Sequence, residues 1–325
     1  MRSPGADSRV HSAAPRLPRM SADARAGEQK HICVCTCTYQ RQKFLKRLLE
    51  ELRHQDTGGV FTYSIVVVDN DRLESAKATV SDFAAASPIP VTYCVEPRQN
   101  IALARNKAIA NAVADFVAFI DDDEFPTKRW LLTLFNACNE YGVDGVLGPV
   151  KPHFDEEPPK WVVEGKFYER RTYPTGFVID GSQGRTGNVL LKREVFASSA
   201  PPFRPEFLTG EDQDFFGRMI EKGHVFIWCD EAVAYETVPP IRWKRTFMLK
   251  RALLQGRMSL FHATSGAREI ARSVLSVPVY TATLPFAFVL GQKRFMTCLV
   301  KLFHHTGRLL ALLGIDPVRQ PYVTD

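Results

Sequence analysis

The sequence predicts an α/β protein built on a doubly wound, mostly parallel sheet over residues 31–150. Short β-branched and aromatic runs alternate there with segments of helical periodicity, which is the rhythm of successive β-α-β units. Several of these runs show no alternation of polar and apolar residues, as expected of strands that are buried on both faces. The chain has 325 residues, of which 45% are hydrophobic, so it can form a large core, and global disorder is excluded.

The expected elements follow one another in a regular order. The predicted strands cover residues 32–37, 63–68, 91–95, 116–120 and 145–150. The predicted helices between them cover residues 44–52, 76–86, 101–113 and 130–139. In the first helix, Leu45, Leu48, Leu49 and Leu52 recur at the spacing of one buried face, and Gly58-Gly59 ends that segment.

The second half of the chain is less regular. Residues 151–185 are rich in Pro, Gly and aromatic side chains and predict an irregular excursion. The elements expected after it are a strand over 186–191, a short helix near 192–196, a helix over 211–222 and a strand over 224–228. From Trp243 onward the pattern is helical, so the predicted fold ends in basic amphipathic and apolar helices.

Charge divides the chain into three regions. Residues 1–30 have a net charge of +3 and no apolar signal segment, which predicts a disordered leader. Residues 31–240, the predicted α/β domain, have a net charge of −7. Residues 241–325 hold thirteen basic and three acidic residues, a net charge of +10. A basic region of this kind favours an anionic partner, either a membrane or a nucleic acid.

Polar side chains follow three of the predicted strands, at the point where each ends. These clusters are Thr38-Tyr39, Asp69-Asn70-Asp71 and the acidic run 121–124. Open parallel sheets bind ligands at this edge, so three clusters in this position predict a site. The acidic run fits Mg²⁺ or Mn²⁺ bound together with substrate phosphates, because hard cations prefer oxygen ligands. The alternative is a solvated turn that caps the next helix.

Three further positions allow two interpretations each. Asp69 could bind a nucleobase or ribose, or it could form an Asx turn. Arg105, near the start of a helix, could bind a phosphate or a base, or it could be solvated. Glu211, Asp212 and Asp214 could provide a general base for an acceptor hydroxyl, or they could cap the helix that they begin.

Six segments occur together in one order along the chain. They are Thr38-Tyr39-Gln40-Arg41, Val66-Val67-Val68-Asp69-Asn70, Ala104-Arg105-Asn106-Lys107, Ile120-Asp121-Asp122-Asp123, Gly187-Asn188 and Gly210-Glu211-Asp212-Gln213-Asp214. Taken together, they resemble an inverting family 2 glycosyltransferase with the GT-A fold. The opening Val-Cys-Thr-Cys-Thr-Tyr and the turn after Val68 are similar to those of bacterial exopolysaccharide glucosyltransferases of the succinoglycan type. The resemblance covers residues 31–265.

The resemblance implies a donor site for a nucleotide-sugar. Tyr39 would stack on the base, usually uracil, and Asp69 would hydrogen-bond it. The residues implied in nucleotide-sugar binding are Thr38, Tyr39, Arg41, Asp69, Arg105, Asp121 and Asp122. Asp123, with Asp121, would bind the Mg²⁺ or Mn²⁺ cofactor that bridges the diphosphate. Arg251 and Gln255 resemble part of a helix that closes over the diphosphate.

The resemblance also implies an acceptor side. Asp212 would be the general base that activates the acceptor hydroxyl, and Glu211 would face the acceptor or the donor sugar. Gly187 and Asn188 would line the acceptor side. Related enzymes often carry a metal-binding His where this chain has Glu236, so we expect this carboxylate to replace it as a ligand.

The implied function is metal-dependent inverting transfer from a nucleotide-sugar, usually a UDP-sugar, to a saccharide or polyprenyl-linked acceptor in cell-surface or exopolysaccharide synthesis. One alternative is a non-catalytic membrane-associated scaffold on the same fold. Another is a haloacid-dehalogenase-type phosphatase, although Phe125 stands where that family has Thr or Val. A Rossmann dehydrogenase is disfavoured because no GxGxxG motif follows the first strand.

The C-terminal region predicts contact with an anionic membrane. Residues 274–290 carry no charge, but Pro278 and Pro285 interrupt them, which favours a re-entrant or interfacial helix pair over a full span. Residues 295–313 form a basic amphipathic pattern, and their apolar content fits lipid better than nucleic acid. The seven cysteines include no CxxC pair and indicate a reducing compartment. We therefore expect a cytoplasmic protein, peripheral at the inner face of the plasma membrane and anchored by residues 274–313.

Overall fold

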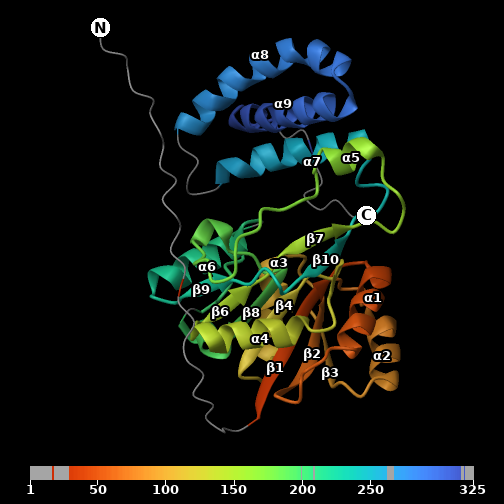
Figure 1. Cartoon of the computed structure of the whole chain (residues 1–325), viewed down its shortest axis with the longest axis vertical. Coiled ribbons are helices and arrows are strands. Elements are labelled where there is room, and N and C mark those ends of the chain that lie inside the picture. The colour runs from red at the N-terminus through yellow and green to blue at the C-terminus, as the bar shows by residue number, and fades with distance from the viewer. Residues whose placement is uncertain are drawn as a thin grey trace.

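The computed structural model describes Leu17, residues 29–198, 200–207, 209–261 and 267–315, and Val318. The predicted disordered leader, residues 1–30, lies almost wholly outside the described residues and stays a prediction. A central sheet with helices on both faces occupies one end of the molecule, and three long helices are stacked at the other end (Figure 1).

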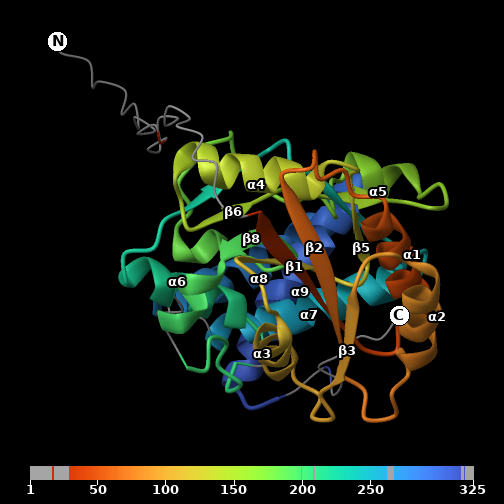
Figure 2. The same ribbon diagram turned by 90° about the horizontal axis from the view of Figure 1, so that it is seen from below.

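The central sheet has seven strands in the order β3-β2-β1-β4-β8-β6-β9, labelled in Figure 1. Figure 2 shows the same sheet from below, with β3, β2 and β1 side by side. Its strands are β1 (Lys30–Thr38), β2 (Phe61–Asp69), β3 (Val91–Val95), β4 (Phe116–Ile120), β6 (Gly145–Leu147), β8 (Asn188–Lys192) and β9 (Phe226–Trp228). Strands β3, β2, β1 and β4 pair with one another in parallel, and so do β6 and β9. Strand β8 lies between these two groups and runs antiparallel to both β4 and β6. The prediction of an α/β fold with a mostly parallel sheet is confirmed.

The helices of this part are α1 (Gln42–Arg53), α2 (Lys77–Ala86), α3 (Ile101–Asn111), α4 (Trp130–Tyr141) and α6 (Glu211–Glu221). The short helix predicted near 192–196 is a 3-10 turn, η2 (Arg193–Ser198), and a second such turn is η1 (Gly181–Gln183). Helices α1, α2 and α4 cover one face of the sheet, and α3 and α6 cover the other. The sheet is therefore doubly wound, as the sequence predicts.

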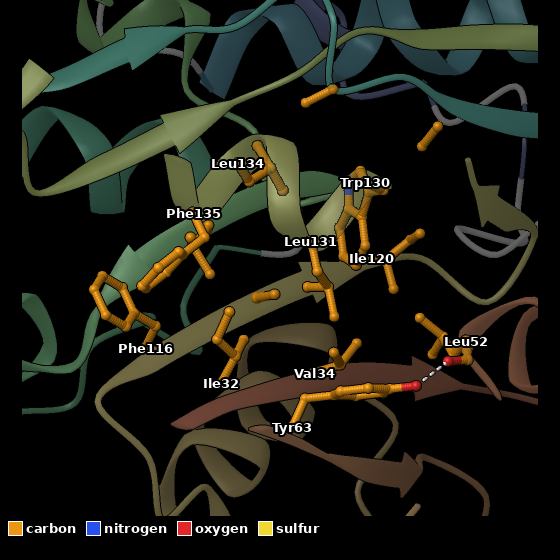
Figure 3. Packing of buried hydrophobic residues seen from close by; sticks show 14 of the residues in the cluster. Ile32, Val34, Leu52, Tyr63, Phe116, Ile120, Trp130, Leu131, Leu134 and Phe135 are labelled. Atoms are coloured by element: carbon orange, nitrogen blue, oxygen red, sulfur yellow. Dashed lines mark hydrogen bonds between the residues drawn. The ribbon is translucent and has the colours of Figure 1, made fainter. Parts of the chain in front are cut away.

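Alternation along β1 shows how two cores form from one strand. Ile32 and Val34 point into the core under α4, whereas Cys33 and Cys35 point into the core under α3 and α6. Figure 3 shows the first core, with Trp130 of α4 above the sheet and the Tyr63 hydroxyl donating to a backbone carbonyl of α1 at 2.7 Å. Burial on both sides explains why β1 and β2 read as nearly continuous apolar runs.

A second, three-stranded sheet has the order β5-β10-β7, with β5 (Glu124–Pro126), β10 (Ala234–Thr237) and β7 (Val150–His153). The predicted strand 145–150 is wrong as a single element, because it ends at Leu147 and a new strand begins at Val150. Gly148 lies at the break, where no side chain fits, because a Cβ atom there would lie 2.2 Å from the Ala232 carbonyl oxygen. The register of the small sheet sets Glu236 beside Glu124, which brings two distant carboxylates together.

The C-terminal helices are α7 (Arg245–Met258), α8 (Ala267–Val289) and α9 (Gln292–Leu312), with the short α5 (Lys160–Glu164) and turn η3 (Ser259–Phe261) beside them. The expectation of a helix pair within 274–290 is wrong, because α8 is one helix that contains both prolines. Helices α7 and α9 cross closely at two glycines. A Cβ atom on Gly256 would lie 1.9 Å from the His304 carbonyl oxygen, and one on Gly307 would lie 2.2 Å from the Leu253 carbonyl oxygen.

Candidate active site

The carboxyl ends of β1, β2 and β4 bring the three polar clusters together. The register of β1 with β2 sets Thr38 beside Asp69. The Thr38 hydroxyl donates to Asp122 Oδ2 at 2.7 Å, which ties the end of β1 to the turn after β4. Tyr39 follows directly and is half-buried. The clusters thus share one edge of the sheet, as their positions along the chain predict.

Asp69 organises the loop that follows β2. Its side chain is fully buried and accepts hydrogen bonds from the backbone N–H groups of Asp71 and Ala76 and from the Tyr93 hydroxyl, at 2.7–3.1 Å. The bond from Asp71 is the Asx turn that the sequence allows. Burial raises the pKa of Asp69, although these donors oppose the shift. A hydrogen bond from this residue to a nucleobase stays a prediction.

Four consecutive carboxylates follow β4, and two of them, Asp121 and Glu124, lie against Gly187. A Cβ atom on Gly187 would lie 2.7 Å from Glu124 Oε1 and 3.2 Å from Asp121 Oδ2, so the missing side chain makes room for both carboxylates. Glu124 is buried, and its Oε1 accepts no hydrogen bond. Burial and the charge of Asp121 raise the pKa of Glu124 well above its usual value. A buried oxygen without a donor is costly, and a proton on this carboxyl or a bound cation would each remove that cost.

Arg41 and Arg242 neutralise the inner carboxylates. Arg41 forms ion pairs with Asp122 at 3.2 Å and with Asp123 at 3.4 Å. Arg242 donates to Asp123 Oδ2 at 2.8 Å and to Glu236 Oε1 at 2.7 Å, and all three side chains are buried. Burial raises the pKa of Asp122 to about 7, against the effect of Arg41 and with that of Asp123. These contacts fix the carboxylates in place before any substrate is bound.

Arg170 is the third cation of the cluster. It binds the other oxygen of Glu236 and lies 3.8 Å from Glu124 Oε1. Both oxygens of Glu236 therefore accept hydrogen bonds from guanidinium groups, and its predicted role as a metal ligand stays a prediction. The sequence did not identify Arg170 or Arg242 as site residues. Their only sequence signal is that buried acids need cations, and the chain offers 42 basic residues to choose from.

Arg105 links the donor edge of the sheet to the start of α6. It is buried, forms an ion pair with Glu211, and lies 3.8 Å from Asp121. Burial opposes its charge, but these carboxylates raise the pKa of Arg105 above its usual value. Burial also raises the pKa of Glu211, against the effect of Arg105. The solvated alternative for Arg105 is thus wrong, because its guanidinium is enclosed between acids from two elements.

Asp212 stands in the first turn of α6, next to this ion pair. Its Oδ1 accepts a hydrogen bond from the backbone N–H of Gln213 at 2.8 Å, and the side chain is half-buried. Burial raises the pKa of Asp212, against the effect of Arg105. Asp214 differs, because Arg204 and Arg218 bind both of its oxygens and lower its pKa against the effect of burial. Of the two aspartates, Asp212 is the one with an oxygen available to a ligand.

A pocket of about 200 Å³ opens beside Gly187, on the predicted acceptor side. It is lined by arginines 170, 171 and 185 and by the aromatic rings of Tyr173 and Trp228. Asn188 also lines it, but its amide is engaged: Oδ1 accepts from the Trp130 indole at 2.7 Å, and Nδ2 donates to two backbone carbonyls. Asn188 thus braces the pocket wall, and any contact with an acceptor stays a prediction.

Helix α7 carries the two residues predicted to close over a diphosphate. Arg251 lies over the Tyr168 ring, 6.0 Å from its centre, and the Tyr168 hydroxyl donates to the Arg242 carbonyl at 2.5 Å. Gln255, one turn further along α7, is exposed. Tyr168 therefore lies between Arg251 and the backbone of Arg242. Closure of Arg251 and Gln255 over a ligand stays a prediction.

The carboxylates fit a divalent cation that is shared with a nucleotide. Within the described residues, no group of three or more His, Cys, Asp or Glu side chains has metal-binding geometry. Magnesium sites often use only one or two carboxylates and take the remaining oxygens from substrate phosphates. Asp121 is half-exposed, and Asp123 uses only Oδ2 for its two arginines. These two residues suit such a site, and the unsatisfied Glu124 oxygen lies beside Asp121.

Comparison with known sequences identifies the family. Residues 33–196 match the profile of the family described as Glycosyl transferase family 2. The chain is 30% identical over 303 residues to the succinoglycan biosynthesis protein ExoM of Rhizobium meliloti, covering 90% of this chain and 96% of that protein. It is also 25% identical over 173 residues to a glucosyl-dolichyl phosphate glucuronosyltransferase of Haloferax volcanii, covering 51% of this chain and 53% of that protein.

Solved structures agree on the fold. The mannosyltransferase PcManGT from Pyrobaculum calidifontis, in complex with GDP-Man and Mn²⁺, superimposes with a TM-score of 0.59 at 17% identity and covers 89% of each chain. Residues 1–349 of TarS from S. aureus, in complex with UDP, give a TM-score of 0.52 at 14% identity, covering 88% of this chain and 93% of that one. The phosphatase alternative is therefore wrong, and the chain belongs to glycosyltransferase family 2, as an enzyme with the GT-A fold.

Proposed function

We propose that this enzyme transfers a hexosyl group from a UDP-sugar to a saccharide or lipid-linked saccharide, with inversion at the anomeric carbon. The observation that carries the proposal is the position of Arg105, which bridges Asp121 and Glu211. It joins the carboxylates at the proposed donor edge to the helix that presents Asp212. A single in-line displacement needs a leaving group and a base held in this fixed relation.

Asp212 is the proposed general base. It takes the proton from the acceptor hydroxyl while that oxygen forms a bond to the anomeric carbon. The bond between the anomeric carbon and the diphosphate oxygen breaks, and the diphosphate leaves with the electron pair. Burial raises the pKa of Asp212, and a base is most effective when its pKa approaches the working pH. Glu211 holds Arg105 and thereby positions the start of α6.

The donor site is proposed at the carboxyl ends of β1, β2 and β4. Thr38, Tyr39, Asp69 and Arg41 would surround the nucleoside, and Asp122, anchored by Thr38, would face the ribose. The TarS and PcManGT complexes, which contain UDP and GDP-Man, support a nucleotide donor of this kind.

Asp121 and Asp123 are the proposed ligands of a divalent cation, Mg²⁺ or Mn²⁺. The Mn²⁺ in the PcManGT complex supports this proposal. Such a cation supplies positive charge next to the leaving diphosphate. Glu236 becomes available as a further ligand only if Arg170 and Arg242 release its oxygens.

The acceptor is proposed to enter through the pocket beside Gly187. Tyr173 and Trp228 line this pocket, and the three arginines suit an acceptor that carries an anionic group. The name of the 30% identical relative supports a role in exopolysaccharide or other cell-surface polysaccharide synthesis. We place the enzyme in the cytoplasm, at the inner face of the plasma membrane, and the unpaired cysteines support a reducing compartment.

We further propose that residues 31–240 form the catalytic domain and that residues 241–325 attach it to the membrane. The attachment also contributes to the site, because Arg242 reaches Asp123 from just beyond this boundary.

Hydrolysis of the donor tests the reaction without a known acceptor. UDP-α-glucose and a panel of other UDP- and GDP-sugars are incubated with the enzyme and Mn²⁺, and proton NMR follows the first sugar released. Inversion predicts the β-anomer before mutarotation, with release of UDP. The α-anomer as first product would contradict an inverting displacement. Release of sugar from GDP-sugars alone would contradict uracil as the nucleobase of the donor. A mock reaction with Asp123→Ala controls for contaminating hydrolases.

A further inference from the structure

Helix α8 presents a wide apolar face to solvent. Figure 1 shows it as the outermost helix, on the side of α9 away from the sheet. Leu275, Val279, Phe286 and Val289 recur at intervals of four, seven and three residues, so they lie on one face. Their exposed fractions are 69%, 58%, 72% and 85%. A contiguous exposed apolar surface of this kind marks a site of contact with another protein or with a membrane.

Composition and burial set α8 apart from a core helix. Within the described residues, α8 is the one helix long and apolar enough to cross a membrane, and only 6% of its most apolar window is buried. Its 23 residues span about 35 Å. Two orientations are therefore open on length alone, one across a bilayer and one along its surface.

A buried polar cluster fixes α8 flat against α9. Arg308 of α9 donates to the Ser273 hydroxyl and to the carboxylate of Glu269, both at 3.1 Å, and Ser273 is also bonded to His305 at 3.0 Å. Helix α9 is in turn locked to α7 at Gly307, where the backbones touch. The cluster lies at one end of α8, but Lys301 is exposed at the middle of α9, so a spanning α8–α9 pair would place this charge in the hydrocarbon, which is costly. The contacts therefore favour α8 along the surface.

The charges around α8 match an anionic surface. Residues 270–315 contain five basic residues and no acidic residue. Arg272 lies near one end of the apolar face, and Lys293 and Arg294 follow the other end, all three exposed. Lys301 is exposed on α9. Basic side chains that flank an apolar helix face bind anionic headgroups while the apolar residues enter the acyl boundary.

An open groove of about 840 Å³ lies where the α8–α9 turn meets α5. Lys160, Lys293 and Arg294 line it, together with one acid, Glu164. Leu290, which is 59% exposed, forms its apolar edge and continues the exposed face of α8. Three cations beside an apolar edge suit a lipid phosphate whose acyl chains lie against α8.

We propose that α8 docks in the plane of an anionic phospholipid bilayer, with its outward face in the acyl boundary and a headgroup phosphate in the groove lined by Lys160, Lys293 and Arg294. The rigid α7–α9 crossing then fixes the distance between the membrane and the site beyond α7. This docking does not depend on sugar transfer, because the surface is formed by residues outside the proposed donor and acceptor sites. The docking does rest on the membrane attachment proposed above. A failed membrane test therefore removes that attachment and leaves the proposed reaction standing.

Vesicle flotation with the full chain tests the docking. The enzyme is mixed with phosphatidylcholine vesicles that contain or lack phosphatidylglycerol. It is expected to float with the anionic vesicles only, and less at high salt. The double variant Phe286→Ser/Val289→Ser should lower the partition coefficient by about a hundredfold, since each buried apolar side chain contributes about tenfold. Lys293→Glu/Arg294→Glu should also release the protein.

A matched control is Leu73→Ser, which removes an equally exposed apolar side chain, 74% exposed, from another part of the molecule. It should float like the unmodified protein. Equal flotation of the Phe286→Ser/Val289→Ser variant and this control would overturn the proposal. The proposal would also be overturned if a second copy of the chain covered this face of α8. In that case sedimentation would show a dimer, the dimer would not float with vesicles, and the double variant would dissociate it.

Labelling depth tests the orientation. A fluorophore is attached to a cysteine placed at Leu275, Ala282 or Val289, which share the outward face of α8 at intervals of seven residues. Quenching by brominated lipids should place all three labels at the same shallow depth. A label at position 282 much deeper than the other two would show a spanning helix and overturn the in-plane arrangement.

Discussion

Replacing Arg242 should destabilise the fold strongly, because this arginine holds two buried carboxylates. Its side chain is 8% exposed, and those of Asp123 and Glu236 are 10% and 11% exposed. Removing one partner of a buried ion pair typically costs about 3–5 kcal/mol. Asp123 keeps Arg41 and Glu236 keeps Arg170, so we expect Arg242→Met to lie near the lower end, at about 3 kcal/mol.

Calorimetry of the enzyme without nucleotide or metal measures this effect. A loss of about 3 kcal/mol corresponds to a fall in Tm of roughly 4–5 °C in a chain of 325 residues. Arg129→Met is the matched control, since its ion pair with Asp56 joins side chains that are 69% and 50% exposed, and such pairs contribute about 0–1 kcal/mol. The double variant Arg242→Met/Glu236→Gln should recover part of the loss. If Arg242→Met lowers Tm no more than Arg129→Met does, the arginines do not hold the carboxylate cluster together.

Three further predictions follow from the same cluster. Mn²⁺ should bind weakly to the free enzyme and at least about tenfold more tightly with UDP present, because the protein offers only one or two carboxylates as ligands. Calorimetric titration measures both affinities, and Asp123→Ala should remove the gain that UDP provides. Gly187→Ala should abolish donor hydrolysis, since its Cβ would lie 2.7 Å from Glu124 Oε1, whereas Gly217→Ala, with no atom within 4 Å, should not. The raised pKa of Asp122, about 7 against an ordinary 3.8, means that the folded state binds this proton more tightly than the unfolded chain does. Stability from this group is therefore complete below about pH 4 and is lost as pH rises through 7, and Asp122→Asn should flatten that part of the pH–stability curve.

Each of these has an outcome that would contradict it. Equal Mn²⁺ affinity with and without UDP would indicate a metal site made by the protein alone. Full activity in Gly187→Ala would show that Glu124 and Asp121 need no such room. An unchanged slope between pH 4 and 7 in Asp122→Asn would assign the titration to another group.

The sequence predicted the fold well where structure is local. The strands at 91–95 and 116–120 have the predicted bounds, because each is a short apolar run between clear breaks. Two predictions from the sequence were wrong. The apolar run 145–150 is divided at Gly148 and Pro149, and α8 continues through Pro278 and Pro285. Packing against α9 keeps that helix continuous despite the two missing N–H groups.

The candidate site was predictable to the extent that it follows strand ends. Thr38 and Asp122 lie 84 residues apart, yet both follow parallel strands, so their meeting at one edge could be inferred. The pairing of Arg242 with Asp123 spans 119 residues. It depends on the path of the chain after β10, which no local sequence pattern encodes. Residue type indicated the acids, whereas only tertiary structure indicated which cations neutralise them.

The most direct test of the central claim is the rate of Asp212→Asn. The substitution keeps the size of the side chain and removes its capacity to take a proton, and Asp82→Asn, an exposed site on α2, is the matched control. UDP release from the donor sugar that the panel identifies is measured with Mn²⁺, and UDP affinity is measured by titration. The account predicts a rate about 10²–10⁴-fold lower in Asp212→Asn with UDP affinity unchanged. A rate equal to that of Asp82→Asn would contradict the assignment of Asp212 as the base.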